Sequence, residues 1–179
     1  MEEKYRLGEV LISRQKIAGR VKELASEIAK DVQGRDLLVV GILTGAAFFL
    51  TDLVREMPED MDVQVDFMSV SSYADSTKSS GIVRILHDLK TSIEGRNVLV
   101  VEDIVDTGLT LSYLLDMLSS RRPASLRTCV LMDKSARRET QVSFDYCGFA
   151  IPDAFVVGYG LDFAEKWRHL KDIRNLERV

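Results

Sequence analysis

The sequence predicts one α/β domain with a doubly wound, mainly parallel sheet that is flanked by helices. Short continuous apolar runs recur through the middle of the chain, which is typical of parallel strands buried on both faces. Amphipathic stretches separate these runs, and alternating strands and helices favour a parallel sheet with right-handed crossovers. The length of 179 residues, with 46% hydrophobic and 29% charged residues, suits a single globular domain.

The first elements alternate as this fold requires. In chain order we expect a helix over 13–32, a strand over 37–42, a tight turn over 44–47, a helix over 48–57 and a strand over 63–70. In the first helix the apolar side chains recur on one face, Ser13 can cap the start and Gly34 can end it. Pro58 ends the second helix, because proline cannot continue one.

The middle of the chain contains one polar interruption. Residues 71–81 are polar and rich in serine, and we expect a mobile loop there. The elements expected after it are a strand over 82–86, a turn over 95–97, a strand over 98–101, a helix containing Leu111, Leu114, Leu115 and Leu118, a strand over 125–132, and short segments over 145–149, 155–159 and 161–170.

The two ends of the chain do not follow this alternation. We therefore expect one domain over 1–179, with a core over about 13–135. Residues 1–12 and 136–179 are expected to form a small hood over one edge of the sheet.

Composition argues against several classes of protein. The net charge of −4 does not favour a broad nucleic-acid surface, no apolar run is long enough to span a membrane, and the first residues lack the apolar segment of a signal peptide. Cys129 and Cys147 lack metal-ligand spacing, and Cys129 is expected to be an inert core thiol. These features fit a reducing cytoplasm.

The strand at 98–101 leads into the segment that is most informative about function. Glu102 and Asp103 end the apolar run, and Asp106 opens the polar loop Asp106-Thr107-Gly108-Leu109-Thr110 before a helix begins. Open α/β sheets bind ligands at the carboxyl ends of strands, and N–H groups at a helix start can hold a phosphate. Carboxylates can bind sugar hydroxyls or Mg²⁺. Together these groups indicate a site for a phosphorylated ribose.

A purely structural role is the alternative for this segment, because Asp106 or Thr107 could simply cap the helix. That role leaves Glu102, Asp103 and Asp106 crowded together, and such carboxylates repel one another without a cation or hydrogen-bond donors. A ligand supplies both, so the functional interpretation is favoured. The loop is not a P-loop, since it lacks Gly-x4-Gly-Lys and has Leu109 where that loop has lysine.

Residues 98–110 resemble the phosphoribosyl-pyrophosphate (PRPP) signature of type I phosphoribosyltransferases. The Glu-Asp-Ile-x-Asp-Thr-Gly form resembles the purine salvage branch, the hypoxanthine-guanine phosphoribosyltransferases. Four further segments are similar to that family in the same order: Leu43-Thr44-Gly45 to its pyrophosphate loop, Ser71-Ser72-Tyr73 to the start of its lid, Met132-Asp133-Lys134 to its purine-reading lysine, and 148–162 to its purine-binding strand and loop. The similarity covers nearly the whole chain.

The resemblance implies transfer of a 5-phosphoribosyl group from PRPP to N9 of hypoxanthine, and also of guanine, giving IMP or GMP and pyrophosphate. Asp106 would be the general base at the purine N7. Residues implied to bind PRPP are Thr44, Gly45, Ser72, Tyr73, Glu102, Asp103, Asp106, Thr107, Gly108, Leu109, Thr110 and Arg168. Glu102, Asp103 and Asp162 would hold Mg²⁺. Leu109 would contribute only its N–H where some relatives have lysine.

The resemblance also implies a purine subsite made of Ile104, Lys134, Phe155, Val156 and Asp162. Lys134 would donate to the 6-oxo group and select oxopurines, because an ammonium group cannot accept from the 6-amino group of adenine. Phe155 would stack on the base, Ile104 would pack against its face, and the backbone carbonyls of Val156 and Asp162 would contact its two-position edge. A cis peptide is implied at the Thr44–Gly45 step, and the 71–81 loop would be a lid.

Alternatives remain open at this point. A regulatory RNA-binding protein of the same fold would need a basic face, for which the arginine pairs at 121–122 and 137–138 are the candidates. A phosphoribosyltransferase for xanthine or a pyrimidine would share the PRPP signature. The family resemblance further implies a homodimer or a homotetramer.

Overall fold

The computed structural model describes residues 5–32, 36–75 and 78–179, and the side chains of residues 72–83 lie outside that description. Its elements in chain order are β1 (Tyr5–Ile12), α1 (Arg14–Asp31), β2 (Leu37–Leu43), α2 (Ala47–Arg55), β3 (Val63–Asp75), β4 (Lys78–His87), β5 (Asn97–Val105), α3 (Leu109–Ser119), β6 (Ser125–Asp133), a short 3₁₀ helix (Ser135–Arg137), β7 (Tyr146–Ala150), β8 (Val156–Val157) and β9 (Ile173–Arg178).

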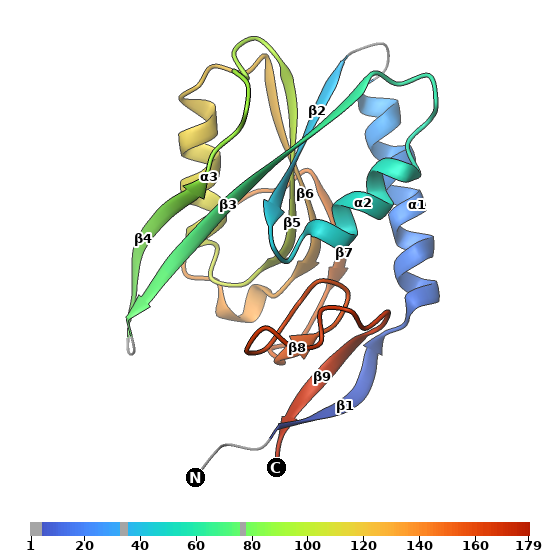
Figure 1. The fold of residues 1–179 in the computed structure, drawn as a ribbon, viewed down its shortest axis with the longest axis vertical. Coiled ribbons are helices and arrows are strands. Elements are labelled where there is room, and N and C mark those ends of the chain that lie inside the picture. Colours follow the sequence, from blue (N-terminus) through green and yellow to red (C-terminus); the bar gives the residue numbers. More distant parts are fainter. Residues whose placement is uncertain (1–4, 33–35, 76–77) are drawn as a thin grey trace.

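Two sheets form the molecule (Figure 1). The larger one has the strand order β4-β3-β2-β5-β6-β7, and the smaller one has the order β1-β9-β8. In the larger sheet β2, β3, β5, β6 and β7 are parallel to their neighbours, and only β4 runs antiparallel, beside β3. The prediction of a doubly wound, mainly parallel sheet flanked by helices is therefore confirmed.

The continuous apolar runs are explained by burial on both faces of this sheet. In β5, Leu99 and Val101 pack in one core cluster with α1 and α2, whereas Val98 and Val100 pack in a second cluster with α3. Successive side chains of a strand point to opposite faces, so a strand covered on both sides must be apolar throughout. This packing fixes the direction of β5 and hence the place where its acidic end emerges.

The helix boundaries agree with the expected signals. Ser13 caps α1, since its hydroxyl accepts a hydrogen bond from the Lys16 N–H at 3.4 Å. The expected stop at Gly34 lies outside the described residues. None of the described helices is long and apolar enough to cross a membrane. Cys129 is buried in the core, and burial raises the pKa of its thiol, which confirms the expected inert cysteine.

The prediction of a loop over 71–81 was wrong for the backbone that is described. β3 continues to Asp75 and β4 begins at Lys78, and the two strands pair with Ser71 opposite Arg84. Figure 1 shows this antiparallel ribbon running beyond the part of the sheet that helices cover. Residues 71–81 are rich in serine and contain no apolar run, so their sequence carries no pattern from which a strand could be predicted.

The smaller sheet forms the hood. β1 pairs antiparallel with β9, and β9 pairs with β8, so both ends of the described chain contribute to it. Residues 146–150 fall within the range expected for the hood, but they pair with β6 in the larger sheet as β7. In Figure 1 the hood lies beyond the end of the larger sheet toward which the β2 arrow points. The space between the hood and this edge contains the site described next.

Candidate active site

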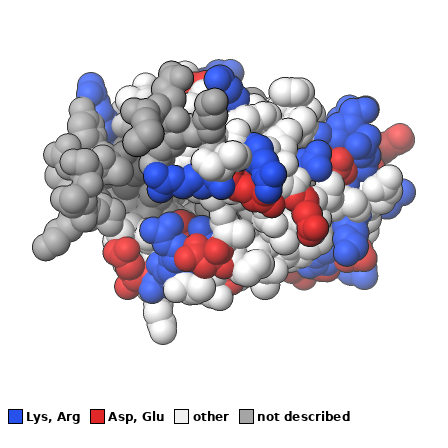
Figure 2. Space-filling model, turned by 90° about the horizontal axis from the view of Figure 1, so that it is seen from below, with Lys and Arg blue, Asp and Glu red and all other residues white. Residues whose placement is uncertain are grey.

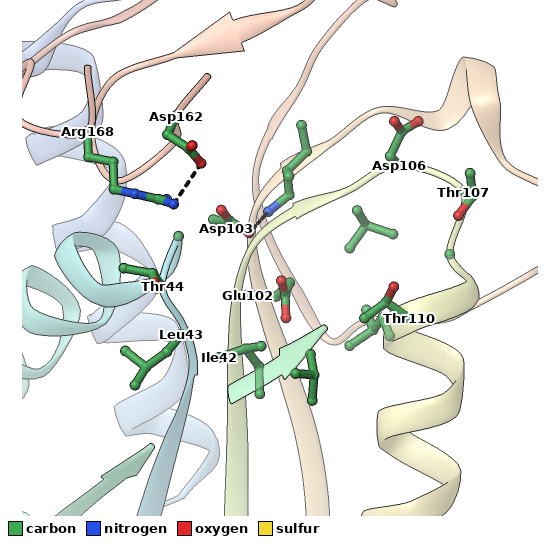
Figure 3. Close-up of a pocket in the computed structure, with 16 residues that line it drawn as sticks. Ile42, Leu43, Thr44, Glu102, Asp103, Asp106, Thr107, Thr110, Asp162 and Arg168 are labelled. Atoms are coloured by element: carbon green, nitrogen blue, oxygen red, sulfur yellow. Dashed lines mark hydrogen bonds and ion pairs between the residues drawn. The ribbon is translucent and has the colours of Figure 1, made fainter. Parts of the chain in front are cut away.

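Two adjoining cavities lie at the carboxyl ends of β2 and β5. The larger has a volume of about 420 Å³, and Figure 3 shows the side chains that line it. The smaller has a volume of about 280 Å³ and is lined in part by Lys134 and Phe155. Asp103, Ile104, Asp106 and Asp162 line both cavities. Glu102 and Asp103 in the last part of β5 and Asp106 just after it therefore line one open space, where the sequence analysis expected them together.

Glu102 and Asp103 are carboxyls held at the end of β5 with few partners. Burial, followed by the adjacent Asp103 carboxylate, raises the pKa of Glu102 well above its usual range. Burial also raises the pKa of Asp103, against the opposing effect of hydrogen bonds that include one from the Ile104 N–H to Oδ1 at 2.8 Å. One oxygen of Glu102, Oε2, is buried without a hydrogen-bond partner. An unpaired buried carboxyl oxygen of this kind is suited to a cation or to a ligand hydroxyl.

The loop after β2 approaches Asp103 so closely that only glycine fits at position 45. A Cβ placed on Gly45 would lie 1.6 Å from Oδ2 of Asp103. Gly160 of the hood meets the same loop, because a Cβ there would lie 2.1 Å from the Gly45 carbonyl oxygen. The cis peptide expected in this loop lies at the Leu43–Thr44 step and not at Thr44–Gly45. Neither residue identity nor spacing distinguishes the two steps, so the resemblance located the loop but misplaced the bond by one residue.

The loop over 106–110 places the N-terminus of α3 at the wall of the larger cavity. Gly108 has φ +85°, and no side chain caps the helix, so neither Asp106 nor Thr107 acts as an N-cap. The first N–H groups of a helix have no partners within the helix, and its positive end favours anions. The Thr107 carbonyl accepts hydrogen bonds from the N–H groups of Glu139 and Thr140 at 2.9 and 3.0 Å, which holds the loop from behind. The geometry fits a bound phosphate.

The two oxygens of the Asp106 carboxylate have different surroundings. Oδ2 lies 3.3 Å from Nη1 of Arg137 and 3.8 Å from Nζ of Lys134. Oδ1 is buried and has no hydrogen-bond partner. The Arg138 Nε donates to the backbone carbonyl of Asp106 at 3.1 Å. Asp106 lines both cavities, is held from one side, and keeps one buried acceptor oxygen without a partner.

The smaller cavity contains a buried cation and an exposed aromatic ring, the reverse of their usual placement. The side chain of Lys134 is only 7% exposed, and its Nζ lies 2.9 Å from Asp153. Phe155 is 54% exposed and contacts Phe163 edge-on at 5.5 Å between ring centres. Neither a solvated lysine nor a core aromatic describes these residues, and both are suited to recognising a flat polar ligand.

Asp162 and Arg168 reach the larger cavity from the hood side (Figure 3). Arg168 Nη2 lies 2.8 Å from Oδ1 of Asp162, and its Nη1 donates to the Gly160 carbonyl at 2.8 Å. This pair therefore brings a guanidinium group over the two carboxyls at the end of β5.

Most of the predicted site residues are brought together, with three exceptions. Leu109 lines neither cavity, and its N–H donates to the Thr107 hydroxyl at 3.4 Å. The side chains of Ser72 and Tyr73 lie outside the described residues. No group of three or more metal-ligating side chains converges within the described part of the chain, so Glu102, Asp103 and Asp162 do not form a complete protein cage for a metal.

Sequence reasoning missed several residues that line the cavities: Leu43, Val70, Arg137, Ala154 and Leu161. Arg137 was considered only as half of a basic pair. Its contact with Asp106 spans 31 residues, and no local pattern reports such a contact.

The comparisons with known proteins agree with this geometry. The family model of the phosphoribosyl transferase domain matches residues 10–164. The hypoxanthine-guanine phosphoribosyltransferase of Bacillus subtilis is 47% identical over 167 residues, which cover 93% of this chain and 92% of that protein. The bifunctional protein TilS/HprT of Listeria monocytogenes is 48% identical over 161 residues, and the chain spans only 24% of its length.

Solved structures give the same result. The crystal structure of a hypoxanthine-guanine phosphoribosyltransferase (hpt-2) from Bacillus anthracis matches with a TM-score of 0.90 and 41% identity, over 97% of this chain and 99% of that one. The matched family model spans the β5 motif and Asp162, whereas Arg168 lies just beyond the matched residues. The chain therefore belongs to the phosphoribosyl transferase family.

Proposed function

We propose that the chain is a Mg²⁺-dependent purine salvage enzyme that transfers the 5-phosphoribosyl group from PRPP to N9 of hypoxanthine or guanine. The products are IMP or GMP and pyrophosphate. One observation carries the proposal: a cavity suited to a phosphorylated sugar and a cavity suited to a flat polar ring meet at Asp106, whose Oδ1 is buried without a partner. The names of the relatives from Bacillus subtilis and Bacillus anthracis support it.

PRPP would occupy the larger cavity. The 5′-phosphate would bind at the start of α3, where Thr107, Gly108 and Thr110 line the wall. The ribose hydroxyls would bind to Glu102 and Asp103. The pyrophosphate would lie near Thr44, Gly45 and Arg168. Ser72 and Tyr73 are proposed to contribute from the lid, and Leu109 through its N–H alone.

Mg²⁺ fits the donors present. Glu102 keeps a buried oxygen without a partner, and Asp103 lies beside it, so the two carboxyls form an oxygen-rich and poorly compensated pair. Mg²⁺ is usually bound by one or two carboxylates together with waters and substrate phosphates, which agrees with the lack of a complete cage among the described residues. Glu102, Asp103 and Asp162 would hold it, and it would neutralise charge on the leaving pyrophosphate.

The purine would occupy the smaller cavity. Lys134 is positioned to donate to the 6-oxo group, and Phe155 offers an exposed face for stacking. Ile104 would pack on the other side of the ring. The backbone carbonyls of Val156 and Asp162 would meet the two-position edge, where guanine has its amino group.

In the proposed reaction the bond from the ribose C1 to the pyrophosphate oxygen breaks as the purine N9 bonds to C1. The proton on N7 passes to Asp106, which acts as general base. Glu102 and Asp103 place negative charge beside the sugar, where positive charge develops. The two cavities hold both reactants in line, which removes much of the entropic barrier to their encounter. Exclusion of water by the lid would protect the reactive sugar.

A turnover assay with PRPP, Mg²⁺ and each of five bases tests the proposal. Hypoxanthine and guanine are expected to react. Adenine is not, because Lys134 can only donate and the 6-amino group cannot accept. Uracil is not, because a pyrimidine lacks the N9 nucleophile and the N7 proton of the proposed reaction. Turnover of xanthine alone, or of uracil alone, would contradict the proposed substrate class and favour one of the other phosphoribosyltransferases. No turnover of any base would contradict the enzymatic function itself.

The RNA-binding alternative finds little support. Figure 2 shows Lys and Arg interspersed with Asp and Glu on the face that it displays. Each arginine considered for a basic face lies against a carboxylate, and the pairs are Arg121–Asp88, Arg122–Glu94, Arg137–Asp106 and Arg138–Asp133. We further propose a cytoplasmic homodimer or homotetramer, which sedimentation equilibrium of the purified chain tests.

A further inference from the structure

The position of Arg137 points to a role that the substrate-binding residues do not cover. Arg137 ends the short 3₁₀ helix that follows Lys134, and it lines the smaller cavity. Its Nη1 lies 3.3 Å from Oδ2 of Asp106, while Oδ1 of the same carboxylate is buried without a partner. The two oxygens are therefore not equivalent, although a free carboxylate could exchange them by rotation.

Lys134 cannot provide this restraint during the proposed reaction. Its Nζ is 3.8 Å from Oδ2 of Asp106 but only 2.9 Å from Asp153. Under the proposed function Lys134 also donates to the 6-oxo group of the base. Arg138 does not reach the carboxylate either, because it donates to the backbone carbonyls of Val105 and Asp106. Among these three cations only Arg137 is available for the Asp106 carboxylate when a base is bound.

We propose that Arg137 is a positioning residue, which fixes the Asp106 carboxylate through Oδ2 and so leaves the unpaired Oδ1 to receive the N7 proton. This inference rests on the proposed function and adds a residue to it. Arg137 itself exchanges no proton: the N7–H bond breaks, the O–H bond forms at Oδ1, and the guanidinium remains a cation throughout. An arginine suits this role because its guanidinium is planar, rigid and permanently charged, so that a single N–H can hold Oδ2 in a defined direction.

A surface ion pair without any effect on catalysis is the competing explanation, since the Arg137 side chain is 55% exposed. The two explanations differ in where the effect appears. A positioning residue changes the rate of the chemical step and acts through Asp106, whereas a surface ion pair changes neither the rate nor its dependence on Asp106.

The test uses single-turnover kinetics, in which the chain with PRPP and Mg²⁺ is mixed with radiolabelled hypoxanthine and quenched. The variants are Arg137→Ala and Arg137→Lys, with Arg55→Ala as the matched control because Arg55 is exposed on α2 and lines neither site cavity. Arg137→Ala is expected to slow the step by about tenfold or more, since small misplacements of a reacting group are costly. Affinity for PRPP is expected to stay within about twofold, as for loss of an exposed ion pair.

Two further measurements decide the mechanism. Arg137→Lys should recover part of the rate, because it restores the cation without the planar guanidinium. In an Asp106→Asn background, Arg137→Ala should change the rate by less than about twofold, since a residue that acts through another loses its effect with it. Circular-dichroism melts verify that each variant is folded.

Three results would overturn the inference alone: a rate for Arg137→Ala equal to that of Arg55→Ala, a loss confined to PRPP affinity, or the same loss in both backgrounds. Absence of turnover by the unsubstituted chain would instead overturn the proposed function and the inference with it.

Discussion

The larger and the smaller cavity are built in different ways. Nine of the sixteen residues lining the larger one come from the single segment between Glu102 and Leu111, which ends β5 and begins α3. The smaller one is assembled from the end of β5, the turn after β6 and the hood, over residues 103–162. A site for phosphate and sugar can thus be encoded locally by one strand end, whereas a site for a flat base requires tertiary packing to bring separate segments together.

The largest effect is expected where the two cavities meet. Asp106→Asn removes the proposed general base while keeping the size of the side chain, so the chemical step should slow by about 10²–10⁴-fold. Binding of PRPP, measured by titration calorimetry with Mg²⁺, should change little because the other residues that line the larger cavity remain. Equal losses in rate and in PRPP affinity would mean that Asp106 is structural and would contradict a catalytic role for it.

A change confined to the larger cavity comes next. Gly45→Ala places a Cβ where Oδ2 of Asp103 lies, so Asp103 or the loop must move. We expect kcat/KM for PRPP to fall on the order of 10²-fold, as for misplaced substrate-positioning groups. Gly19→Ala on α1 is the matched control, since a Cβ there meets no atom within 4 Å. The control should retain activity and gain about 0.5–1 kcal/mol of stability, because alanine favours a helix over glycine. Similar activity in Gly45→Ala and Gly19→Ala would contradict the close approach of Gly45 to the Asp103 carboxyl.

A change confined to the smaller cavity should leave PRPP binding intact. Lys134→Ala removes a buried charged donor, so we expect KM for hypoxanthine to rise about 10–100-fold, in line with about 1.5–3 kcal/mol for hydrogen bonds to charged groups. The preference for hypoxanthine over adenine should also weaken. Lys22→Ala, an exposed lysine on α1, is the control. An unchanged preference would remove Lys134 from the base site.

The smallest effect is expected outside both cavities, in the network of Tyr146, Asp31 and Arg127. Tyr146 donates to Asp31 at 2.6 Å and accepts from Arg127 at 2.8 Å. Burial, followed by the hydrogen bond to Asp31, raises the pKa of Tyr146 to about 12. Tyr146→Phe should lower the free energy of unfolding by about 1 kcal/mol near neutral pH, without a change in turnover.

The pH dependence of that difference follows from the sign of the shift. The folded protein retains the Tyr146 proton more strongly than the unfolded chain, whose pKa is near the ordinary value of 10.0. The stabilisation of the folded protein by the Tyr146 hydroxyl is therefore complete below pH 10 and is lost as the pH rises through about 12. Urea unfolding of the unsubstituted chain and of Tyr146→Phe across this pH range should show the difference between their free energies of unfolding becoming smaller. A difference in unfolding free energy that grows with pH would contradict the raised pKa of Tyr146.

This difference between the cavities also explains how far the sequence could be interpreted. The run from Val98 to Thr110 contains its own strand, acids and helix start, so the proposed phosphate and sugar site could be inferred from neighbouring residues. The Ser13 cap and the continuous apolar run of β5 were predictable for the same reason, because caps and apolar runs are local.

The rest depended on contacts between distant residues. A lysine at a strand end is usually solvated and an aromatic in an apolar run is usually core, so only the family resemblance assigned Lys134 and Phe155 to a base site. Arg137 was not identified as a site residue, because its contact with Asp106 is created by packing of the turn after β6. Strands over 63–70 and 82–86 were predicted, but the continuation of β3 to Asp75 and the start of β4 at Lys78 were missed, since the serine-rich residues 71–81 carry no apolar run.

A crystal structure of the chain with hypoxanthine, Mg²⁺ and an unreactive PRPP analogue tests the central claim most directly. The claim predicts a 5′-phosphate at the first turn of α3, a base between Ile104 and Phe155, and N7 within hydrogen-bonding distance of Oδ1 of Asp106. A base bound elsewhere, or one whose N7 faces away from Asp106 while the phosphate is in place, would contradict it.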